Sequence, residues 1–402
     1  MAPNPAAGAP GLDQLLSAKE IVVSCGPGGV GKTTIAAAAG AMAAVHLGGR
    51  VLVLTVDPAR RLASALGLAG PDGIGNVEMK VPDEAFDQAG ISPRGQLWAA
   101  QLDTKQSWDA LVRRHAPDLE TAARILANPL YRNVAGRFVH SHEYIAMERL
   151  YEIHRQGDYD LIVVDTPPSR HALDLLEAPG KMGEFFSSRL LRLLVAPYRS
   201  RLMNLATRPF YQVADRILGS QFLEEIAEFF SLFQSMYEGF VERADAVTRL
   251  LHDRRTAFMA VTTLEPTPLR ETEKLASALA DRGYHLGALV LNRALPTYLR
   301  DPAAVAVAER LAARSKEVAE QLAPGVGQTK EVQRVIAEVA ESFLNFNLVA
   351  QREAEQQGEL EVTAGVVSMA PHFATDIHDL CGLLRLGATL WGAPRLRGAP
   401  PD

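Results

Sequence analysis

A glycine-rich run around a lysine and two threonines is the first feature with chemical potential. Gly26 is followed by four residues and then by Gly31, Lys32 and Thr33, which fits the pattern G-x-x-x-x-G-K-[ST]. Glycines let backbone N–H groups turn towards phosphate oxygens, and a following helix adds the positive end of its dipole. Lys32 offers a charge to the outer phosphates, and Thr33 offers a hydroxyl to Mg²⁺. The pattern predicts a nucleotide phosphate site.

Two aspartates follow apolar runs of the kind that form buried strands. Asp57 ends VLVLTVD, and Asp165 ends DLIVVD. Carboxylates at the carboxyl ends of parallel strands face the ligand crevice, where one can hold Mg²⁺ and the other can orient an attacking water. Each aspartate alone would also suit a helix N-cap. The phosphate loop in the same chain favours the nucleotide role.

The elements that must position these residues alternate along the chain. Helical periods separate the apolar runs and are clearest at 34–47 and 269–283. This alternation predicts an α/β fold, a P-loop NTPase with a mainly parallel doubly wound sheet and an inserted α-helical subdomain. The predicted strands are 20–25, 51–57, 97–103, 160–165, 257–264, 286–292 and 363–370.

The regular spacing of the predicted strands is interrupted twice, and both interruptions have a helical pattern. They cover about 104–157 and 178–255, and we interpret them as one helical insert in a single nucleotide-binding domain at 18–393. The ends, 1–17 and 394–402, are rich in Pro, Gly and Ala, and we expect them to be disordered tails.

Composition excludes several classes of protein. The chain has 402 residues, 48% of them hydrophobic and 22% charged, with a net charge of −6. The acidic balance argues against general nucleic-acid affinity, and no apolar run is long enough to cross a membrane. The N-terminus does not resemble a secretory signal. With Cys25 and Cys381 as the only cysteines, we expect a cytoplasmic protein, with peripheral membrane contact left open.

The motifs together resemble one family, the arsenite-pump ATPases (ArsA), which include the guided-entry ATPases that target tail-anchored membrane proteins. The resemblance covers most of 20–390 in family order. The matching stretches are GPGGVGKTT, TVDPARRLASALG, LWAAQLD, HEYIAMERL, DYDLIVVDTPPSRHALDLL, LEPTPLRETEKL, VLNRALP and MAPHFATDIHDLCGLL.

The resemblance implies an ATPase that uses ATP and Mg²⁺, with Lys32 as a catalytic residue. Asp57 would orient the attacking water, and Asp165 would join Thr33 at the metal. Asn292 would read the adenine edge, although a strand-end turn residue is the plainer interpretation. Two residues, Pro371 and Phe373, would form a wall beside the base. The residues implied at the phosphates are Gly28, Gly29, Val30, Gly31, Lys32, Thr33 and Thr34.

Pro27 departs from the family pattern. Most members carry a lysine there, which reaches across a dimer into the partner's nucleotide site. Proline has no charged side chain, so this chain cannot supply that charge. Proline also fixes φ and removes an N–H, so we expect a stiffer loop tip. Three interpretations stay open: a heterodimer with a paralogous ATPase that carries the lysine, a homodimer in which Arg60 or Arg61 replaces it, or a subunit that binds ATP and hydrolyses it poorly.

The cysteines argue against thiol chemistry. Arsenite capture needs several thiolates, and the guided-entry members often hold zinc with a C-x-x-C pair, which this chain lacks. Histidines occur at 140, 142, 372 and 378, but scattered histidines are usually core or surface residues. We therefore expect neither an arsenite nor a zinc site.

The segment 181–240 is unusually rich in Phe, Leu and Met. One interpretation is an apolar groove or lid, gated by nucleotide, that holds a hydrophobic client protein or membrane component. The other is the core of the helical subdomain, or a dimer interface. We expect a dimeric ATPase whose nucleotide state controls this segment. The rivals are a nucleotide-gated scaffold with little turnover, and a partition-type ATPase that acts on DNA or a membrane surface, which the acidic balance disfavours.

Overall fold

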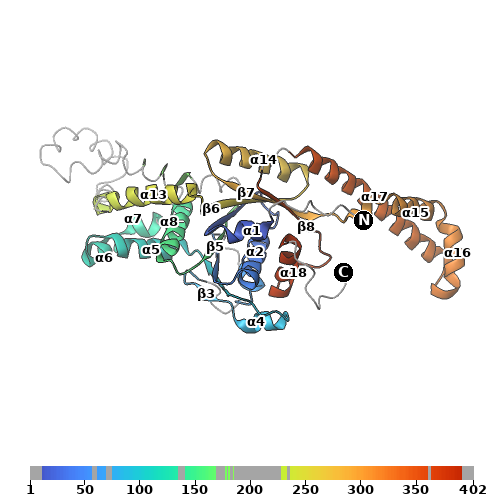
Figure 1. Ribbon diagram of the computed structural model, residues 1–402, viewed down its shortest axis with the longest axis horizontal. Helices are drawn as coiled ribbons and strands as arrows, with labels where there is room; N and C mark the ends of the chain where they lie inside the picture. Colours follow the sequence, from blue (N-terminus) through green and yellow to red (C-terminus); the bar gives the residue numbers. More distant parts are fainter. Residues whose placement is uncertain are drawn as a thin grey trace.

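The computed structural model describes residues 11–56, 61–68, 75–134, 141–168, 177–178, 180–181, 184, 228–232, 236–360 and 364–391. These residues form an eight-stranded sheet in the order β3-β4-β2-β5-β1-β6-β7-β8, with helices on both faces (Figure 1). Every neighbouring pair is parallel except β3 and β4. The prediction of a mainly parallel, doubly wound α/β fold is confirmed.

The predicted strands are all present, and their ends differ from the predicted ends by a few residues. They are β1 (Ile21–Cys25), β2 (Arg50–Thr55), β4 (Gln96–Gln101), β5 (Leu161–Asp165), β6 (Thr256–Thr262), β7 (Leu286–Ala294) and β8 (Val366–Pro371). The short edge strand β3 (Met79–Lys80) was not predicted, because two partly exposed residues leave no apolar run to detect.

Each face of the sheet has its own apolar core. The helices on one face include α1 (Leu12–Ser17), α2 (Lys32–His46), α3 (Arg61–Ala65), α4 (Asp83–Gln88) and α18 (Leu380–Trp391). The other face carries α8 (Ser141–Gln156), α13 (Tyr237–His252) and α14 (Pro266–Asp281). Helix α2 is buried along most of its length because its alanines favour helix and let it lie close to the sheet.

Helix α1 corrects the prediction that residues 1–17 form a disordered tail. Leu12 and Leu16 are buried, and so is Leu15, whose Cδ1 lies beside Gly287 at the start of β7. The spacing of three and four residues places all three leucines on one helix face. The burial of that face holds the segment 12–17 against the sheet, so the tail prediction was wrong there. The end at 394–402 lies outside the described residues.

The described part of 104–157 is helical, as expected. It contains α5 (Thr104–His115), α6 (Leu119–Ala127), α7 (Pro129–Val134) and α8. Most of the segment 178–255 lies outside the described residues, although α13, which belongs to this segment, is described. The division into one domain with a single insert therefore stays a prediction.

A second helical region was not predicted. Between β7 and β8 the chain forms η1 (Thr297–Arg300), α15 (Pro302–Ala313), α16 (Ser315–Val326) and α17 (Thr329–Glu359). We call these elements the arm, because Figure 1 shows them projecting away from the sheet. Asn347 Nδ2 donates to the Leu299 carbonyl oxygen at 2.7 Å, and Leu295 N donates to Glu353 Oε2 at 2.9 Å. These bonds tie α17 to the chain that leaves β7.

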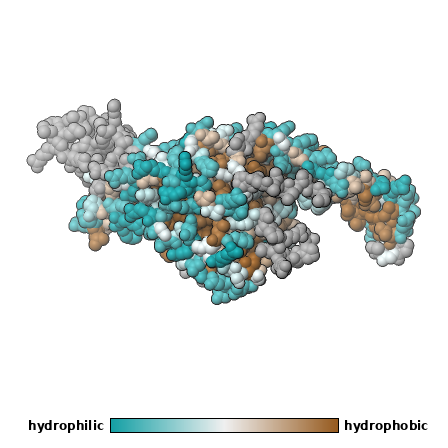
Figure 2. Space-filling model, in the orientation of Figure 1, coloured by the Kyte–Doolittle hydropathy of each residue, from teal (hydrophilic) through white to brown (hydrophobic). Residues whose placement is uncertain are grey.

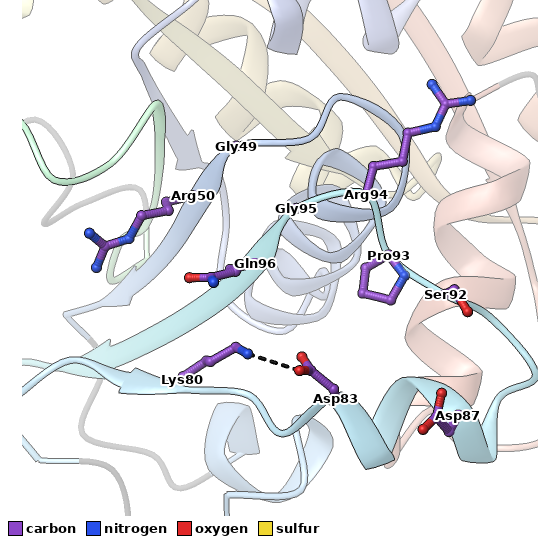
Figure 3. Close-up of a pocket in the computed structure, with 10 residues that line it drawn as sticks. All are labelled: Gly49, Arg50, Lys80, Asp83, Asp87, Ser92, Pro93, Arg94, Gly95 and Gln96. Atoms are coloured by element: carbon purple, nitrogen blue, oxygen red, sulfur yellow. Dashed lines mark hydrogen bonds and ion pairs between the residues drawn. The ribbon is translucent and has the colours of Figure 1, made fainter.

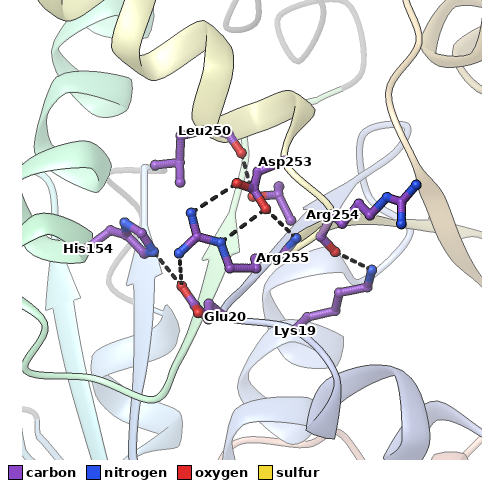
Figure 4. Close-up of polar contacts among 8 residues, drawn as sticks. Lys19, Glu20, His154, Leu250, Asp253, Arg254 and Arg255 are labelled. Atoms are coloured by element: carbon purple, nitrogen blue, oxygen red, sulfur yellow. Dashed lines mark hydrogen bonds and ion pairs between the residues drawn. The ribbon is translucent and has the colours of Figure 1, made fainter.

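The amino ends of β1 and β6 are held by a polar network (Figure 4). Glu20 Oε2 lies 2.8 Å from His154 Nε2 and 3.2 Å from Arg255 Nη1, while Asp253 accepts from the same guanidinium at 2.9 Å. Surface ion pairs of this kind contribute little individually. The network fixes the edge of the sheet opposite to the phosphate loop.

Candidate nucleotide site

The phosphate loop connects β1 to α2 at the carboxyl edge of the sheet. Gly26 has φ +147°, and a Cβ there would lie 2.0 Å from the Val261 carbonyl oxygen. Gly31 has φ +91°, and a Cβ there would lie 2.4 Å from Asn292 Nδ2. Glycine is therefore favoured at both positions by backbone conformation, and at Gly26 also by the lack of space beside the Val261 backbone. The loop lies directly against the ends of β6 and β7.

The N-terminus of α2 presents backbone donors to this edge. Gly31 is its N-cap, and no side chain caps the helix there. The first N–H groups of a helix have no partner within the helix, and its dipole favours an anion at that end. Gly28 and Gly29 are exposed at the tip of the loop, whereas Val30 is buried beneath it. The loop thus has the shape of a phosphate cradle.

Lys32 is buried within the loop. Its Nζ donates to the Pro27 carbonyl oxygen at 2.8 Å, and the residue is only 7% exposed. A cation removed from water needs such an acceptor. Pro27 thus offers its backbone oxygen to the lysine of the motif, a role that its ring does not prevent.

Asp165 collects two hydroxyl groups. Thr33 Oγ1 donates to Asp165 Oδ2 at 2.7 Å, and Thr55 Oγ1 donates to the same oxygen at 3.0 Å. The carboxylate is fully buried at the end of β5. A hydroxyl beside a carboxylate is a hard-oxygen pair of the kind that Mg²⁺ prefers. Sequence reasoning missed Thr55, whose only signal is one polar residue near the end of an apolar strand.

Asn292 contacts the phosphate loop itself. Its Nδ2 donates to the Val30 carbonyl at 2.8 Å, and the residue is 7% exposed. The register of β7 and β8 shifts between Leu291 and Ala294, and Arg293 has φ +57°. Such an irregularity re-aims side chains at the end of a strand. The structure brings Asn292 to the site, and its role at adenine stays a prediction.

Pro371 and Phe373 follow β8. Pro371 pairs with Ala294, so it lies at the same edge of the sheet as the end of β7. The Arg385 guanidinium lies 5.2 Å from the centre of the Phe373 ring, a distance suited to a cation–π contact. That contact fixes one face of the ring. A role beside the base stays a prediction.

Several predicted residues lie outside the described part of the chain. They include Asp57 and Arg60, while Arg61 begins α3 and its side chain is not described. Most of 181–240 is also outside it. Two of its described side chains, Phe229 and Met236, are buried in the core that also contains α8 and α13. The interpretation as a client groove is therefore neither confirmed nor contradicted.

The two cysteines have different surroundings. Burial raises the pKa of Cys25 to about 12, with the nearby Lys32 charge opposing the shift, so the thiol is protonated at neutral pH. Cys381 is exposed. Across the ranges that the structure describes, no group of three or more His, Cys, Asp and Glu side chains is arranged to hold a metal ion.

A separate cleft of about 570 Å³ lies at the amino ends of β2 and β4 (Figure 3). Lys80 pairs with Asp83 at its side, at 3.0 Å. The Arg50 guanidinium lies 4.9 Å from the Trp98 ring, which orders this edge. The phosphate loop follows the carboxyl end of β1, so this cleft is at the opposite edge of the sheet and is not part of the nucleotide site.

A glycine cradle at the switch point of a parallel sheet, where ligands of such folds bind, defines a P-loop nucleotide-binding protein. The chain also matches the family described as anion-transporting ATPase over residues 19–336. That match spans most of the chain, so the chain belongs to the ArsA-type anion-transporting ATPase family and is an ATPase.

Individual relatives agree with this family. The chain is 26% identical over 285 residues to the putative arsenical pump-driving ATPase 2 of Aquifex aeolicus, covering 69% of this chain and 80% of that protein. It is 32% identical over 278 residues to the uncharacterized protein SCO2128 of Streptomyces coelicolor, covering 67% and 61% respectively. It is 24% identical over 288 residues to ATPase GET3 of Malassezia globosa, covering 71% and 76%.

Among the helices whose placement the structure describes, none is both long enough and apolar enough to span a bilayer.

Proposed function

We propose that this ATPase binds ATP with Mg²⁺ at the carboxyl edge of the sheet and hydrolyses it there. The observation that carries the proposal is the convergence of Thr33 and Thr55 on Asp165 beside a loop that requires glycine. Residues 28–34 would hold the phosphates. Thr33 and Asp165 would hold Mg²⁺, which when bound neutralises charge on the phosphate oxygens.

The remaining roles follow the family resemblance. Lys32 would place its charge on the outer phosphates, and Asp57 would orient the attacking water. Asn292 would read the adenine edge, with Pro371 and Phe373 beside the base. The contact of Asn292 with Val30 supports its place in the site, because it links the end of β7 to the phosphate loop.

We infer that the active form is a dimer, as the family resemblance implies. Pro27 stands where the family pattern has a lysine that acts across the dimer. A paralogous ATPase would supply that lysine in a heterodimer, or Arg60 or Arg61 would replace it in a homodimer. A cation supplied in trans is worth about 10³–10⁵ in rate for phosphoryl transfer.

We infer that the nucleotide state is transmitted to the helical segment 178–255, in which residues 181–240 would bind a hydrophobic client protein or a membrane component. The support is its apolar sequence and its connection to Asp165 through the chain that follows β5. We place the chain in the cytoplasm, with peripheral membrane contact allowed. The alternative is a nucleotide-gated scaffold, favoured by a loop tip that has proline in place of lysine.

Steady-state ATP hydrolysis by the purified chain tests the proposal. Lys32→Ala is the blank, and Lys19→Ala is the matched control, since Lys19 Nζ donates to the Arg254 carbonyl at the opposite edge of the sheet. Turnover above the blank in the wild type and in the control supports an ATPase that is complete in one kind of chain. ATP binding without turnover supports the scaffold or the heterodimer. Absence of ATP binding overturns the proposal.

Pro27→Lys separates the interpretations of the loop tip. If no other residue supplies the cation, the variant gains turnover by about 10³-fold or more. If Arg60 or Arg61 already supplies it, turnover does not rise. A gain that requires a concentration high enough for dimerisation would support action across the dimer.

A further inference from the structure

The arm carries a large share of the exposed apolar surface. Half of the large hydrophobic side chains that are exposed in the described residues lie on α15, α16 and α17, and Figure 2 shows apolar atoms gathered at that end of the molecule. They are Val307, Leu322, Val335, Val339, Phe346, Leu348 and Val349. Contiguous exposed apolar patches mark interaction surfaces, whereas single exposed apolar side chains need no explanation.

Helix α17 has one line of buried side chains and a second line, mostly apolar, that is mostly exposed. Ala340, Asn347 and Ala350 are buried on the side that faces the rest of the arm. Each follows a residue of a second line by one position, so the two lines lie about 100° apart around the helix. The apolar arc of α17 is thus wider than the surface that its own chain covers.

The uncovered line has the spacing of a coiled-coil seam. We call it the outer stripe, and its spacings of three and four residues alternate without a break. Val339 is 60% exposed and Phe346 is 54% exposed within it. An average repeat of 3.5 residues keeps a seam facing a second helix along its length. The members of the outer stripe are Val332, which is half-buried, and the exposed residues Val335, Val339, Ser342, Phe346 and Val349.

The outer stripe is complementary to itself when two copies run in opposite directions. In one antiparallel register, Val335 of one copy faces Phe346 of the other, and Val339 faces Ser342. The bulky ring is thereby placed opposite a smaller side chain in both halves of the pair. A parallel pair would instead place Phe346 against Phe346 and Ser342 against Ser342, which leaves one layer crowded and one layer polar.

Charge supports the same direction. Glu331 and Arg352 are exposed, on the same flank of the outer stripe and near its opposite ends. In the antiparallel pair, Glu331 of one copy lies level with residue 350 of the other, so Arg352 is only about 3 Å further along the axis. The contact occurs twice, as a two-fold axis requires. Opposite charges flanking the seam favour that partner and that direction.

We propose that the outer stripe of α17 is an interface for a second copy of this chain, in which the two α17 helices pair in antiparallel orientation. The pairing needs no nucleotide, and it does not depend on the ATPase proposal. A standard stable interface buries about 800 Å² on each partner, and we expect this single helix pair to bury less. We therefore expect association in the micromolar range from the arm alone.

Sedimentation of the nucleotide-free full chain over a micromolar concentration series tests the pairing. The wild type is expected to dimerise, and Phe346→Glu is expected to raise the dissociation constant at least tenfold. Leu348→Glu is the matched control, because Leu348 is 49% exposed on the same helix but points away from the outer stripe. A monomeric wild type, or equal effects of both substitutions, would overturn the proposal.

Disulfide cross-linking tests the register. In a Cys381→Ser background, the remaining native cysteine, Cys25, is buried and is not expected to form cross-links. The double variant Val335→Cys/Phe346→Cys is expected to give a cross-linked dimer, whereas Val335→Cys alone is not, since its two copies would lie about 16 Å apart along the axis. Cross-linking by the single variant would indicate a parallel pair and overturn the antiparallel one.

Discussion

The nucleotide edge of the sheet and the arm differ in where they place polar and apolar side chains. At the edge, polar groups are buried and receive partners from the same chain: Lys32 from Pro27, Asp165 from Thr33 and Thr55. On the arm, Val339 and Phe346 are apolar and face outward. Burying an unpaired polar group costs free energy, and so does exposing an apolar seam. At the edge these buried polar groups contact one another within one chain, whereas the outer stripe of the arm faces outward.

The largest expected effect tests whether Asp165 organises the edge. Asp165→Asn keeps the shape but removes the charge that accepts from both threonine hydroxyls, so ATP turnover is expected to fall at least about 100-fold. Asp160→Asn is the matched control, because Asp160 accepts from Arg50 N at the opposite edge of the sheet. Equal turnover in the two variants, measured by phosphate release, would break the assignment of the edge as the site.

The next effect concerns the link between β7 and the phosphate loop. Asn292→Ala removes the donor to the buried Val30 carbonyl, at a cost of about 1–3 kcal/mol. We expect ATP affinity to weaken by about tenfold, because 1.4 kcal/mol corresponds to a factor of ten. Calorimetric titration measures the affinity, and thermal unfolding without nucleotide separates it from general destabilisation. Unchanged affinity would show that Asn292 serves the fold alone.

A third substitution asks whether the arm is energetically separate from the edge. Asn347→Ala removes the buried donor to Leu299 O, which costs about 1–3 kcal/mol locally. We expect faster amide exchange in η1 and the middle of α17, with ATP turnover unchanged. Asn345→Ala, on the exposed side of the same helix, should change neither. A loss of turnover in Asn347→Ala alone would show that the two regions are coupled.

The smallest expected effect is a pH dependence in α5. Burial, together with the charges of Arg243 and Arg114, lowers the pKa of His115 from 6.5 to about 4. As pH falls from about 6.5 to about 4, the unfolded chain gains a proton that the folded chain does not, so stability decreases across that window. The ring is partly exposed, so solvent screening keeps the effect small.

His115→Gln should flatten this dependence. Urea unfolding at pH 7 and pH 5 measures it, and the loss of stability between the two values should be smaller in the variant. Identical losses in the wild type and the variant would mean that the burial of His115 has no effect on stability.

The fold was largely predictable, and so was the meeting of Thr33 with Asp165 at the end of β5. Apolar runs as short as DLIVVD identify strands that are buried on both faces, and G-x-x-x-x-G-K-T marks its own strand–loop–helix context. Helix α1 was missed because three leucines in a short segment look like a tail until the sheet covers them. The arm was missed because its helices carry no motif and interrupt the alternation of strands and helices only once.

By itself, the sequence determined the chemistry of the chain: which loop requires glycine, which residues carry charge, and which family pattern they follow. Only the tertiary structure decided which groups meet. Thr55 and Asp165 are 110 residues apart, and the parallel pairing of β2 with β5 brings them within 3.0 Å. The outer stripe of α17 is likewise invisible as a surface until the inner line is seen to be covered. The type of each side chain is given by its own position in the sequence, but its burial depends on which other parts of the chain pack over it.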